Sequence, residues 1–373
     1  MADTKVFLSG GRIQGRSDDS VSVLDDVPND SWKEIGRFEV TGSATNSFVV
    51  RGLNSATSGD MAAKDNLLIL LHTQDHSNSG VRAQIRFNTT TADSTGKYSD
   101  RSSNAGGATE TRSGQDFAYF SESDGDDQTM ETAYVRNRDD FVKLYHGEGA
   151  RSAGTDSSSS IQRYVHAGKW NSTDQITKVH IKAHGGGTYT FGVGTECIVL
   201  GCDDDEDGDS GDAFFDKLVT TTPLTSDTST ITGTFTGKKW IMGYAWTYGS
   251  GSARNCLRIN GQDGGSDYRE TYSHEGSTGD ASTTSRSNIR MMGENSASHG
   301  KFSRFFICKY SGKQPIVHAI GMDDGGSGHG TETEFWESAG KLLSTSAITS
   351  VSIFNDESGD FGSGSLFALW GGN

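Results

Sequence analysis

The feature that most constrains this fold is a repeat inside the chain. Three pairs of segments match: 167–181 (AGKWNSTDQITKVHI) with 339–353 (AGKLLSTSAITSVSI), 85–88 (IRFN) with 257–260 (LRIN), and 191–194 (FGVG) with 361–364 (FGSG). The separation is 172 residues for the first two pairs and 170 for the third, as a hairpin turn of different length would produce. A repeat of this kind predicts one folding unit used twice.

The repeat divides the chain into four parts. We predict an N-terminal arm at 1–31, a first domain at 32–202, an acidic linker at 203–212 and a second domain at 213–373. The arm has no counterpart in the second copy. It is either a free tail or an extended arm that becomes ordered on a neighbouring subunit.

Short alternating runs indicate strands rather than helices. Val179, Ile181 and Ala183 fall on one face of a period-two pattern, with polar side chains between them. The chain has 49 Gly but only 3 Pro, which suits sheets joined by glycine turns. We therefore predict an all-β protein of two tandem antiparallel β-sandwiches. At about 170 residues, each copy suits an eight-stranded jelly roll with long loops better than an immunoglobulin-like sandwich.

Four aromatic residues share one face of a predicted strand. They are Trp240, Tyr244, Trp246 and Tyr248. A sandwich core is the favoured interpretation, and a platform on which sugars stack is the alternative.

Charge and hydropathy exclude several partners. The formal net charge is −16, and no cluster of Lys and Arg offers a surface for phosphates, so nucleic acid is not expected. The longest apolar run, residues 67–71, is far below the roughly 18 residues that span a bilayer. The first residues lack the layout of a secretory signal, so we expect synthesis in a cytoplasm without export by the general route.

No pattern in the sequence predicts catalysis. The string Gly208-Asp209-Ser210-Gly211 surrounds the nucleophile of chymotrypsin-like proteases, but here it lies among carboxylates that disfavour an oxyanion. The pairs His72 with His76 and His180 with His184 have the i, i+4 spacing of helical zinc sites. Along a strand that spacing separates side chains by about 13 Å, so neither pair is expected to bind metal. We predict no catalytic residue, no cofactor and no enzyme activity.

The linker carries the one metal candidate. Asp203, Asp205 and Asp207 match the start of a calcium loop, but the twelfth position, where a bidentate Glu is needed, is Phe214. A solvated linker is the favoured interpretation, and a low-affinity Ca²⁺ site is the alternative.

Cysteines do not suggest a covalent framework. The four residues Cys197, Cys202, Cys256 and Cys308 are irregularly spaced, with no C-x-x-C pair. Isolated, mostly buried thiols are therefore predicted.

Several motifs resemble structural proteins of tailed viruses of bacteria or archaea. The motifs are WKEIGR at 32–37, RFN at 86–88 followed by Tyr98, AGKW at 167–170, DQIT at 174–177, FGVG at 191–194 and LG at 200–201. The resemblance covers most of the first copy and the final third of the second. The second copy lacks the opening WKEIGR motif.

The resemblance implies a role in a virus particle. It leads us to expect a non-enzymatic protein on the virion surface, assembled in the host cytoplasm, with other virion proteins as partners. A capsid decoration or cement protein anchored by residues 1–31 is the main expectation, as a homo-oligomer and specifically a trimer. The alternative is a tail fibre or tail-associated protein that binds cell-surface carbohydrate for host adhesion.

Overall fold

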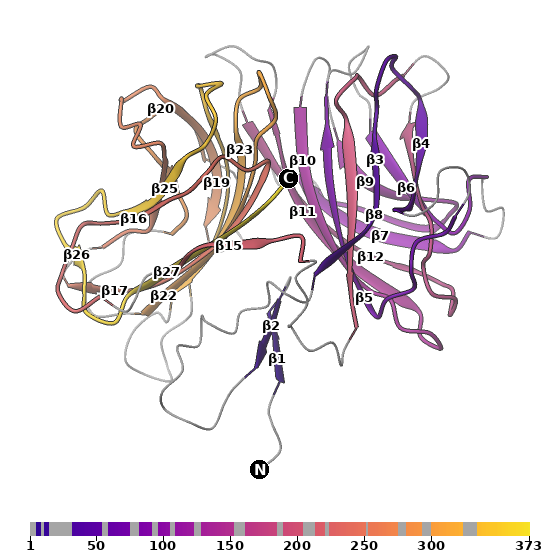
Figure 1. Cartoon of the computed structure of the whole chain (residues 1–373), viewed down its shortest axis with the longest axis horizontal. Coiled ribbons are helices and arrows are strands. Elements are labelled where there is room, and N and C mark those ends of the chain that lie inside the picture. The colour runs from indigo at the N-terminus through magenta and orange to yellow at the C-terminus, as the bar shows by residue number, and fades with distance from the viewer. Residues whose placement is uncertain are drawn as a thin grey trace. The chain divides into compact units, whose positions relative to one another are not determined.

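The computed structural model describes most of the chain outside its N-terminal segment. Described are residues 5–8, 11–14, 32–53, 59–74, 82–91, 96–104, 109–122, 128–152, 161–184, 189–203, 213–220, 224–250, 253–274, 281–292, 300–323 and 334–373. Among these residues every regular element is a strand, and no helix is long and apolar enough to cross a membrane. The chain forms two compact units: the second comprises residues 216–373 with 161–163, and the first comprises the other described residues up to 215. The all-β prediction is therefore confirmed (Figure 1).

The first unit contains twelve described strands that follow one hydrogen-bonded path. They are β3 (Lys33–Glu39), β4 (Ser47–Gly52), β5 (Asn66–Thr73), β6 (Arg82–Phe87), β7 (Tyr98–Asn104), β8 (Thr109–Gln115), β9 (Ala118–Glu122), β10 (Gln128–Arg136), β11 (Lys143–Ser152), β12 (Ile161–Trp170), β13 (Val179–His184) and β14 (Glu196–Cys202). The order along the path is β8-β7-β12-β11-β10-β5-β14-β3 and then β4-β13-β6-β9. The pairings of β8 with β7, of β7 with β12, and of successive strands along the path from β11 to β9 are antiparallel.

The core of the first unit lies between the eight-stranded and four-stranded parts of this path. One hydrophobic cluster takes Ile69 and Val199 from the larger part and Phe48 and Ile181 from the smaller. Alternation places these residues on the inner faces, because successive side chains of a strand point to opposite sides. The predicted inward face of residues 179–183 is thereby confirmed.

The second unit is built from the described strands β15 to β27. They are β15 (Asp216–Thr220), β16 (Thr230–Thr234), β17 (Trp240–Ser250), β18 (Cys256–Ile259), β19 (Tyr268–His274), β20 (Ala281–Arg286), β21 (Ile289–Arg290), β22 (Gly300–Cys308), β23 (Ile316–Asp323), β24 (Phe335–Leu342), β25 (Ser350–Phe354), β26 (Asp360–Phe361) and β27 (Leu366–Gly372). One sheet has the order β15-β27-β17-β22-β23-β24-β19-β20, with β26 beside β17, and the other is β16-β25-β18-β21. Again one hydrophobic cluster draws on both sheets.

The two units share their strand order. We renumber the strands of each unit from 1 to 12 in chain order, starting at β3 in the first unit and at β15 in the second, and leaving out β26. In both units the larger set then has the order 6-5-10-9-8-3-12-1 and the smaller set the order 2-11-4-7. Each unit thus has twelve strands in this order, where eight were expected. The added strands β7 (YSDRSSN) and β8 (TETRSGQ) carry few apolar residues, so the alternation that marks a strand is missing from their sequences.

One difference between the units concerns the junction of their sheets. In the first unit β3 pairs directly with β4, through Gly36 with Gly52 and Arg37 with Arg51. In the second unit the corresponding strands β15 and β16 belong to separate sheets. The first unit is therefore a continuous ladder that turns at the β3–β4 corner.

An asparagine occupies the same place in both units, after β6 and after β18. Asn88 has φ of 58° and Asn260 has φ of 55°, a region in which asparagine is favoured among non-glycine residues. The Asn88 side chain donates to the carbonyl of Gln175 (2.7 Å) and accepts from the backbone N–H of Thr177 (2.9 Å) and Lys178 (3.2 Å).

The bonds of Asn260 match those of Asn88. It donates to the carbonyl of Ala347 (2.8 Å) and accepts from the N–H groups of Thr349 (2.8 Å) and Ser350 (3.2 Å). These partners lie 172 residues beyond those of Asn88. In each unit the asparagine therefore fixes the approach to the strand that follows the matched AGK segment.

The turn between β10 and β11 is built around a buried ammonium group. Lys143 is fully buried, and its Nζ donates to the carbonyls of Arg138 (2.5 Å), Phe141 (2.7 Å) and Thr173 (2.9 Å). Burial lowers the pKa of Lys143 from its ordinary value. The three carbonyls supply the hydrogen bonds that a buried ammonium requires.

Part of the N-terminal segment forms a hairpin. Strand β1 (Lys5–Leu8) pairs antiparallel with β2 (Gly11–Gln14). The other residues of the predicted arm lie outside the described ranges, so its role as an extended anchor stays a prediction.

The aromatic residues of β17 divide into a buried and a partly exposed pair. Trp240 and Tyr244 are buried, whereas Trp246 and Tyr248 are 41% and 39% exposed. The intervening Ile241 belongs to the hydrophobic cluster between the two sheets. The four aromatic residues therefore lie on the opposite face from that cluster, which differs from the sandwich-core interpretation: the period shows that they share a face, but not which face is inward.

Candidate functional site

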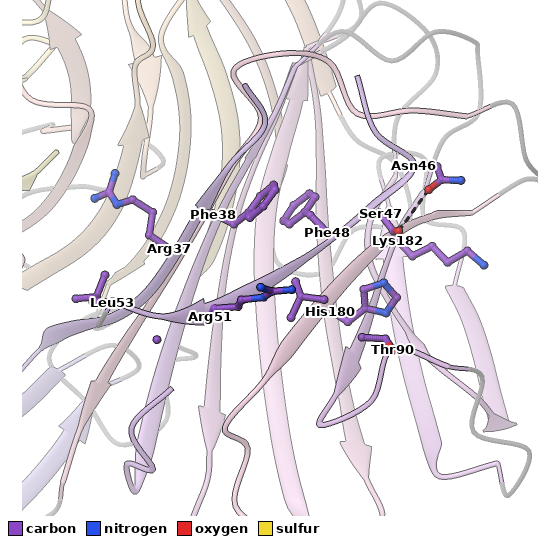
Figure 2. Close-up of a pocket in the computed structure, with 12 residues that line it drawn as sticks. Arg37, Phe38, Asn46, Ser47, Phe48, Arg51, Leu53, Thr90, His180 and Lys182 are labelled. Carbon is purple, nitrogen blue, oxygen red and sulfur yellow. Dashed lines mark hydrogen bonds between the residues drawn. The ribbon is translucent and has the colours of Figure 1, made fainter. Parts of the chain in front are cut away.

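A groove of about 880 Å³ opens on the first unit, where β3, β4 and β13 meet (Figure 2). Its described lining combines basic, hydroxyl, amide and apolar groups. The lining residues are Arg37, Phe38, Asn46, Ser47, Phe48, Val49, Arg51, Gly52, Leu53, Thr90, His180 and Lys182. This size lies within the range of about 300–1,000 Å³ found for small-molecule sites.

Two glycines allow the corner at which the groove forms. A Cβ atom on Gly36 would lie 2.6 Å from the Met61 Sδ and 2.8 Å from the Arg51 carbonyl oxygen. A Cβ atom on Gly52 would lie 2.6 Å from the Asp60 carbonyl oxygen. Only glycine permits such close approach of neighbouring backbone, so these positions bring β3 against β4 and set the shape of the groove.

Strand alternation aims the basic side chains at the groove. On β4, Phe48 and Val50 join the hydrophobic cluster, and Arg51 points to the other side. On β13, His180 and Lys182 alternate with the inward residues in the same way. Figure 2 shows Arg51, His180 and Lys182 along this outer face.

The charge of the groove is positive. Every ionisable group in its described lining is basic, and no carboxylate occurs among those residues. Arg37 is bound to Glu34 (2.8 Å) and Glu196 (2.5 Å), and its hydrogen bond to Glu34 is the largest cause that raises its pKa. The charge of Arg37 is therefore balanced, and Lys182 adds positive charge to the groove.

His180 is the unusual group of the groove. It is only 5% exposed, and its Nδ1 has no hydrogen-bond partner among the described residues. Burial, followed by the positive charges of Arg86 and Lys182, lowers its pKa to about 4. The imidazole is therefore neutral near pH 7, and the hydrogen-bonding capacity of its Nδ1 is not used by any described residue.

The next histidine on β13 contrasts with His180. His184 Nδ1 lies 2.5 Å from the Gln84 Nε2, and its Nε2 lies 3.1 Å from the Tyr119 hydroxyl. Arg112 stacks over the Tyr119 ring at 3.8 Å from its centroid. Both ring nitrogens of His184 thus form hydrogen bonds within the protein, so His184 has no free nitrogen for a ligand.

The predicted calcium residues are only partly described. Asp203 binds the Lys64 ammonium (2.7 Å) and accepts from the Asp65 N–H (3.1 Å). Asp205, Asp207 and Ser210 lie outside the described residues. No group of three or more His, Cys, Asp or Glu side chains in the described part of the chain could hold a metal ion.

The thiols behave as predicted. None of the four cysteines, all of which lie in the described ranges, forms a disulfide, and Cys197, Cys256 and Cys308 are buried. Burial is the main cause that raises the pKa of Cys197 and Cys256, which disfavours the reactive thiolate.

A buried acid–base pair lies inside the first unit. The Glu131 carboxylate is 3.1 Å from His166 Nδ1, and both residues are buried. Burial raises the pKa of Glu131 above its ordinary value and lowers that of His166 to about 3, so the imidazole is neutral near pH 7. Their burial away from solvent favours a structural role over proton transfer to a substrate.

Sequence reasoning did not identify the groove. The alternation at 179–184 placed His180 and Lys182 on the polar face of their strand, but it gave them no role. Arg51 reaches the same groove through the β3–β4 corner, whose two glycines are separated by 16 positions in the sequence. That pairing depends on a long-range register that neither strand shows by itself.

Comparisons with known proteins leave the family open. No protein-family model and no curated protein matches the sequence. Among solved structures, human GIVD cytosolic phospholipase A2 aligns with 84% of this chain and 33% of its own length, at 6% identity and a TM-score of 0.10. The chain thus spans about a third of the length of that structure. A similarity this low carries no argument about fold or function.

Proposed function

We propose that this chain is a non-enzymatic structural protein on the surface of a virus particle, and specifically a capsid decoration or cement protein. The observation that carries this proposal is the strand order that both units share. Jelly rolls built from two four-stranded sheets recur in viral capsid proteins and in lectins. The motifs that resemble tailed-virus structural proteins point in the same direction.

Each unit contains the elements of a jelly roll. In the first unit, β3-β14-β5-β10 supplies four adjacent strands of the larger part, and β4-β13-β6-β9 supplies the smaller part. Strands β7, β8, β11 and β12 extend the larger part beyond β10. We interpret each unit as a jelly-roll-like sandwich with a four-stranded extension.

We further propose that the two units arose by internal duplication. Besides Asn88 and Asn260, two tyrosines support this interpretation. The N–H of Phe87 donates to the Tyr98 hydroxyl (2.7 Å), and the N–H of Ile259 donates to the Tyr268 hydroxyl (2.8 Å). Equivalent hydrogen bonds at equivalent strand positions are the expected result of a duplicated module.

The proposed partners are other virion proteins, in a homo-oligomer that we expect to be a trimer. The N-terminal arm at 1–31 is the proposed anchor on the shell. Closed point-group symmetry is usual for such assemblies.

Binding to purified capsids tests the capsid proposal. The full chain should bind saturably to shells that lack it, and a variant without residues 1–31 should not. Unfolding of both proteins in urea provides the control, because loss of the arm should leave the folded units intact. Equal binding by the two proteins would exclude the arm as the anchor, and no binding by either would contradict the decoration role.

The second candidate is a carbohydrate-binding role in host adhesion. The specific observation that favours it is the groove, which presents basic and hydroxyl side chains beside Val49 and Leu53. Sugar rings combine polar hydroxyls with apolar C–H faces, and a mixed lining suits both. Binding of the full chain to a glycan array tests this candidate, and an array without any bound glycan would contradict it.

A further inference from the structure

We infer that the groove between β3, β4 and β13 binds the anionic group of an acidic saccharide, with Lys182 supplying positive charge and His180 a directed hydrogen bond. This inference rests on the second proposed function and names its ligand class. The anionic group is a carboxylate or a sulfate, and the two are separated in the experiment below.

The first argument is charge. The protein has a formal net charge of −16, yet the described lining of the groove holds only basic ionisable groups. The nearby cations that belong to the sheet itself are already paired, Lys178 with Asp60 (3.1 Å) and Arg86 with Asp116 (3.0 Å). The basic lining attracts negative ligands locally, against the negative charge of the whole protein.

The second argument is the unpartnered nitrogen of His180. A buried polar atom without a hydrogen bond costs about 1–3 kcal/mol, so such atoms in a groove mark positions that a ligand or water fills. The imidazole is neutral near pH 7, and one nitrogen of a neutral ring donates while the other accepts. A saccharide offers both an anionic oxygen and hydroxyl groups to such a ring.

The third argument is size and lining. A volume of about 880 Å³ far exceeds what a single inorganic anion needs. Asn46, Ser47 and Thr90 add amide and hydroxyl groups, while Val49 and Leu53 add apolar surface. This combination fits a ring that bears hydroxyls as well as a charge, and it favours a saccharide over a small ion.

The second unit supplies an internal contrast. Ser352 stands at the position of His180 and bonds to the Thr232 hydroxyl (2.9 Å), and Phe354 stands at the position of Lys182 under the Arg258 guanidinium (3.5 Å). There the outer face is occupied by contacts between its own side chains. The inferred site therefore belongs to the first unit.

The experiment measures binding of the full chain to three polysaccharides at low and high salt. The probes are polygalacturonate, which carries carboxylates, dextran sulfate, which carries sulfates, and neutral dextran. We expect binding to at least one acidic probe, none to dextran, and weakening with added salt because charges at an open groove are screened. Binding to one acidic probe alone identifies the anionic group.

Matched variants locate the binding. Lys182→Ala should weaken binding at least tenfold, and His180→Ser at least threefold. Lys313→Ala, which removes the same charge from the second unit, should have no effect. Urea unfolding verifies that each variant is folded, and Lys182→Ala carries the test if His180→Ser is not.

The outcomes separate the inference from the function on which it rests. Binding to neutral dextran or to neutral glycans alone would keep a carbohydrate-binding function and overturn the anionic site. Acidic binding that Lys182→Ala leaves unchanged would also overturn the site. Failure to bind any glycan would overturn both.

Discussion

The outer faces of the two four-stranded sheets differ, although their strand orders agree. In the first unit, β4 and β13 present Arg51, His180 and Lys182 to a groove. In the second unit, β16 and β25 present a Thr232–Ser352 hydrogen bond and Phe354 beneath Arg258. The two units therefore share their strand order and their apolar inner faces, whereas the side chains on the outer face can differ and serve a separate role.

Both units keep the side chains that form hydrogen bonds to backbone groups between strands. Asn88 and Asn260 each bond three equivalent backbone groups, and the Tyr98 and Tyr268 hydroxyls each accept an N–H from the strand that precedes them in the chain. Replacing such groups leaves backbone donors without partners, which is costly in a buried sheet. The comparison can therefore be tested by paired substitutions, one in each unit.

The largest expected effect comes from the matched core phenylalanines. Phe191 and Phe361 are both fully buried, and each exchanges two backbone hydrogen bonds with a threonine. Phe191→Ala and Phe361→Ala should each lower the free energy of unfolding by about 3–5 kcal/mol, because each leaves a cavity. Urea unfolding measures the loss, and Val193→Ala, at a position 52% exposed, serves as the control. A cost below about 1 kcal/mol in one unit alone would break the equivalence.

The next effect concerns the paired asparagines. Asn88→Ala and Asn260→Ala should each cost about 2–3 kcal/mol, because each removes three hydrogen bonds to backbone and leaves alanine with φ above zero. Asn46→Ala, on an exposed residue, is the matched control. Thermal unfolding of the three variants gives the comparison. Similar losses for Asn260→Ala and Asn46→Ala would show that the second unit does not use this hydrogen-bond arrangement for stability.

Acid should distinguish the units through His180. Its folded pKa of about 4 lies below the ordinary value of 6.5, so the unfolded chain binds the proton first as the pH falls. The stabilising contribution of neutral His180 is complete above pH 6.5 and is lost as the pH falls from 6.5 to 4. At pH 5 the free energy of unfolding should be lower by about 1–2 kcal/mol. His180→Ser, which copies Ser352, should remove that part of the pH dependence.

The measurement for His180 is an NMR titration together with urea unfolding at pH 7 and pH 5. The buried His166 also has a lowered pKa, about 3, and remains in both proteins, so the difference between wild type and His180→Ser isolates the groove residue. An NMR titration midpoint of His180 near 6.5 would contradict the predicted environment.

The smallest effect is expected at the counterpart of His180. Ser352→Ala should cost about 1 kcal/mol through loss of its bond to Thr232, and it should leave acidic-saccharide binding unchanged. Calorimetric titration with polygalacturonate or dextran sulfate, whichever the wild type binds, checks the second part. A loss of affinity in Ser352→Ala would mean that the second unit also takes part in binding.

The sequence allowed the strand class and the matched segments to be predicted. Residues 85–88 and 257–260 match in sequence, and the structure gives Asn88 and Asn260 equivalent hydrogen bonds. The inward face of β13 also followed from its alternation. These features are local, and a period of two residues is enough to reveal them.

The groove and the added strands could not be predicted in this way. Pairing of Gly36 with Gly52 depends on register between strands, and polar strands such as β7 and β8 lack an apolar face to mark them. The aromatic residues of β17 illustrate the same limit. Their shared face was clear from the spacing, but the side on which the core lies depends on the rest of the sheet.

The enclosed ammonium of Lys143 has a chemical consequence. Its three carbonyl partners and complete burial keep it away from amine-reactive reagents in the folded first unit. Once strands β10 and β11 separate, the same amine becomes an ordinary nucleophile. The rate of covalent labelling at Lys143, measured by mass spectrometry, would therefore report the rate at which that hairpin opens.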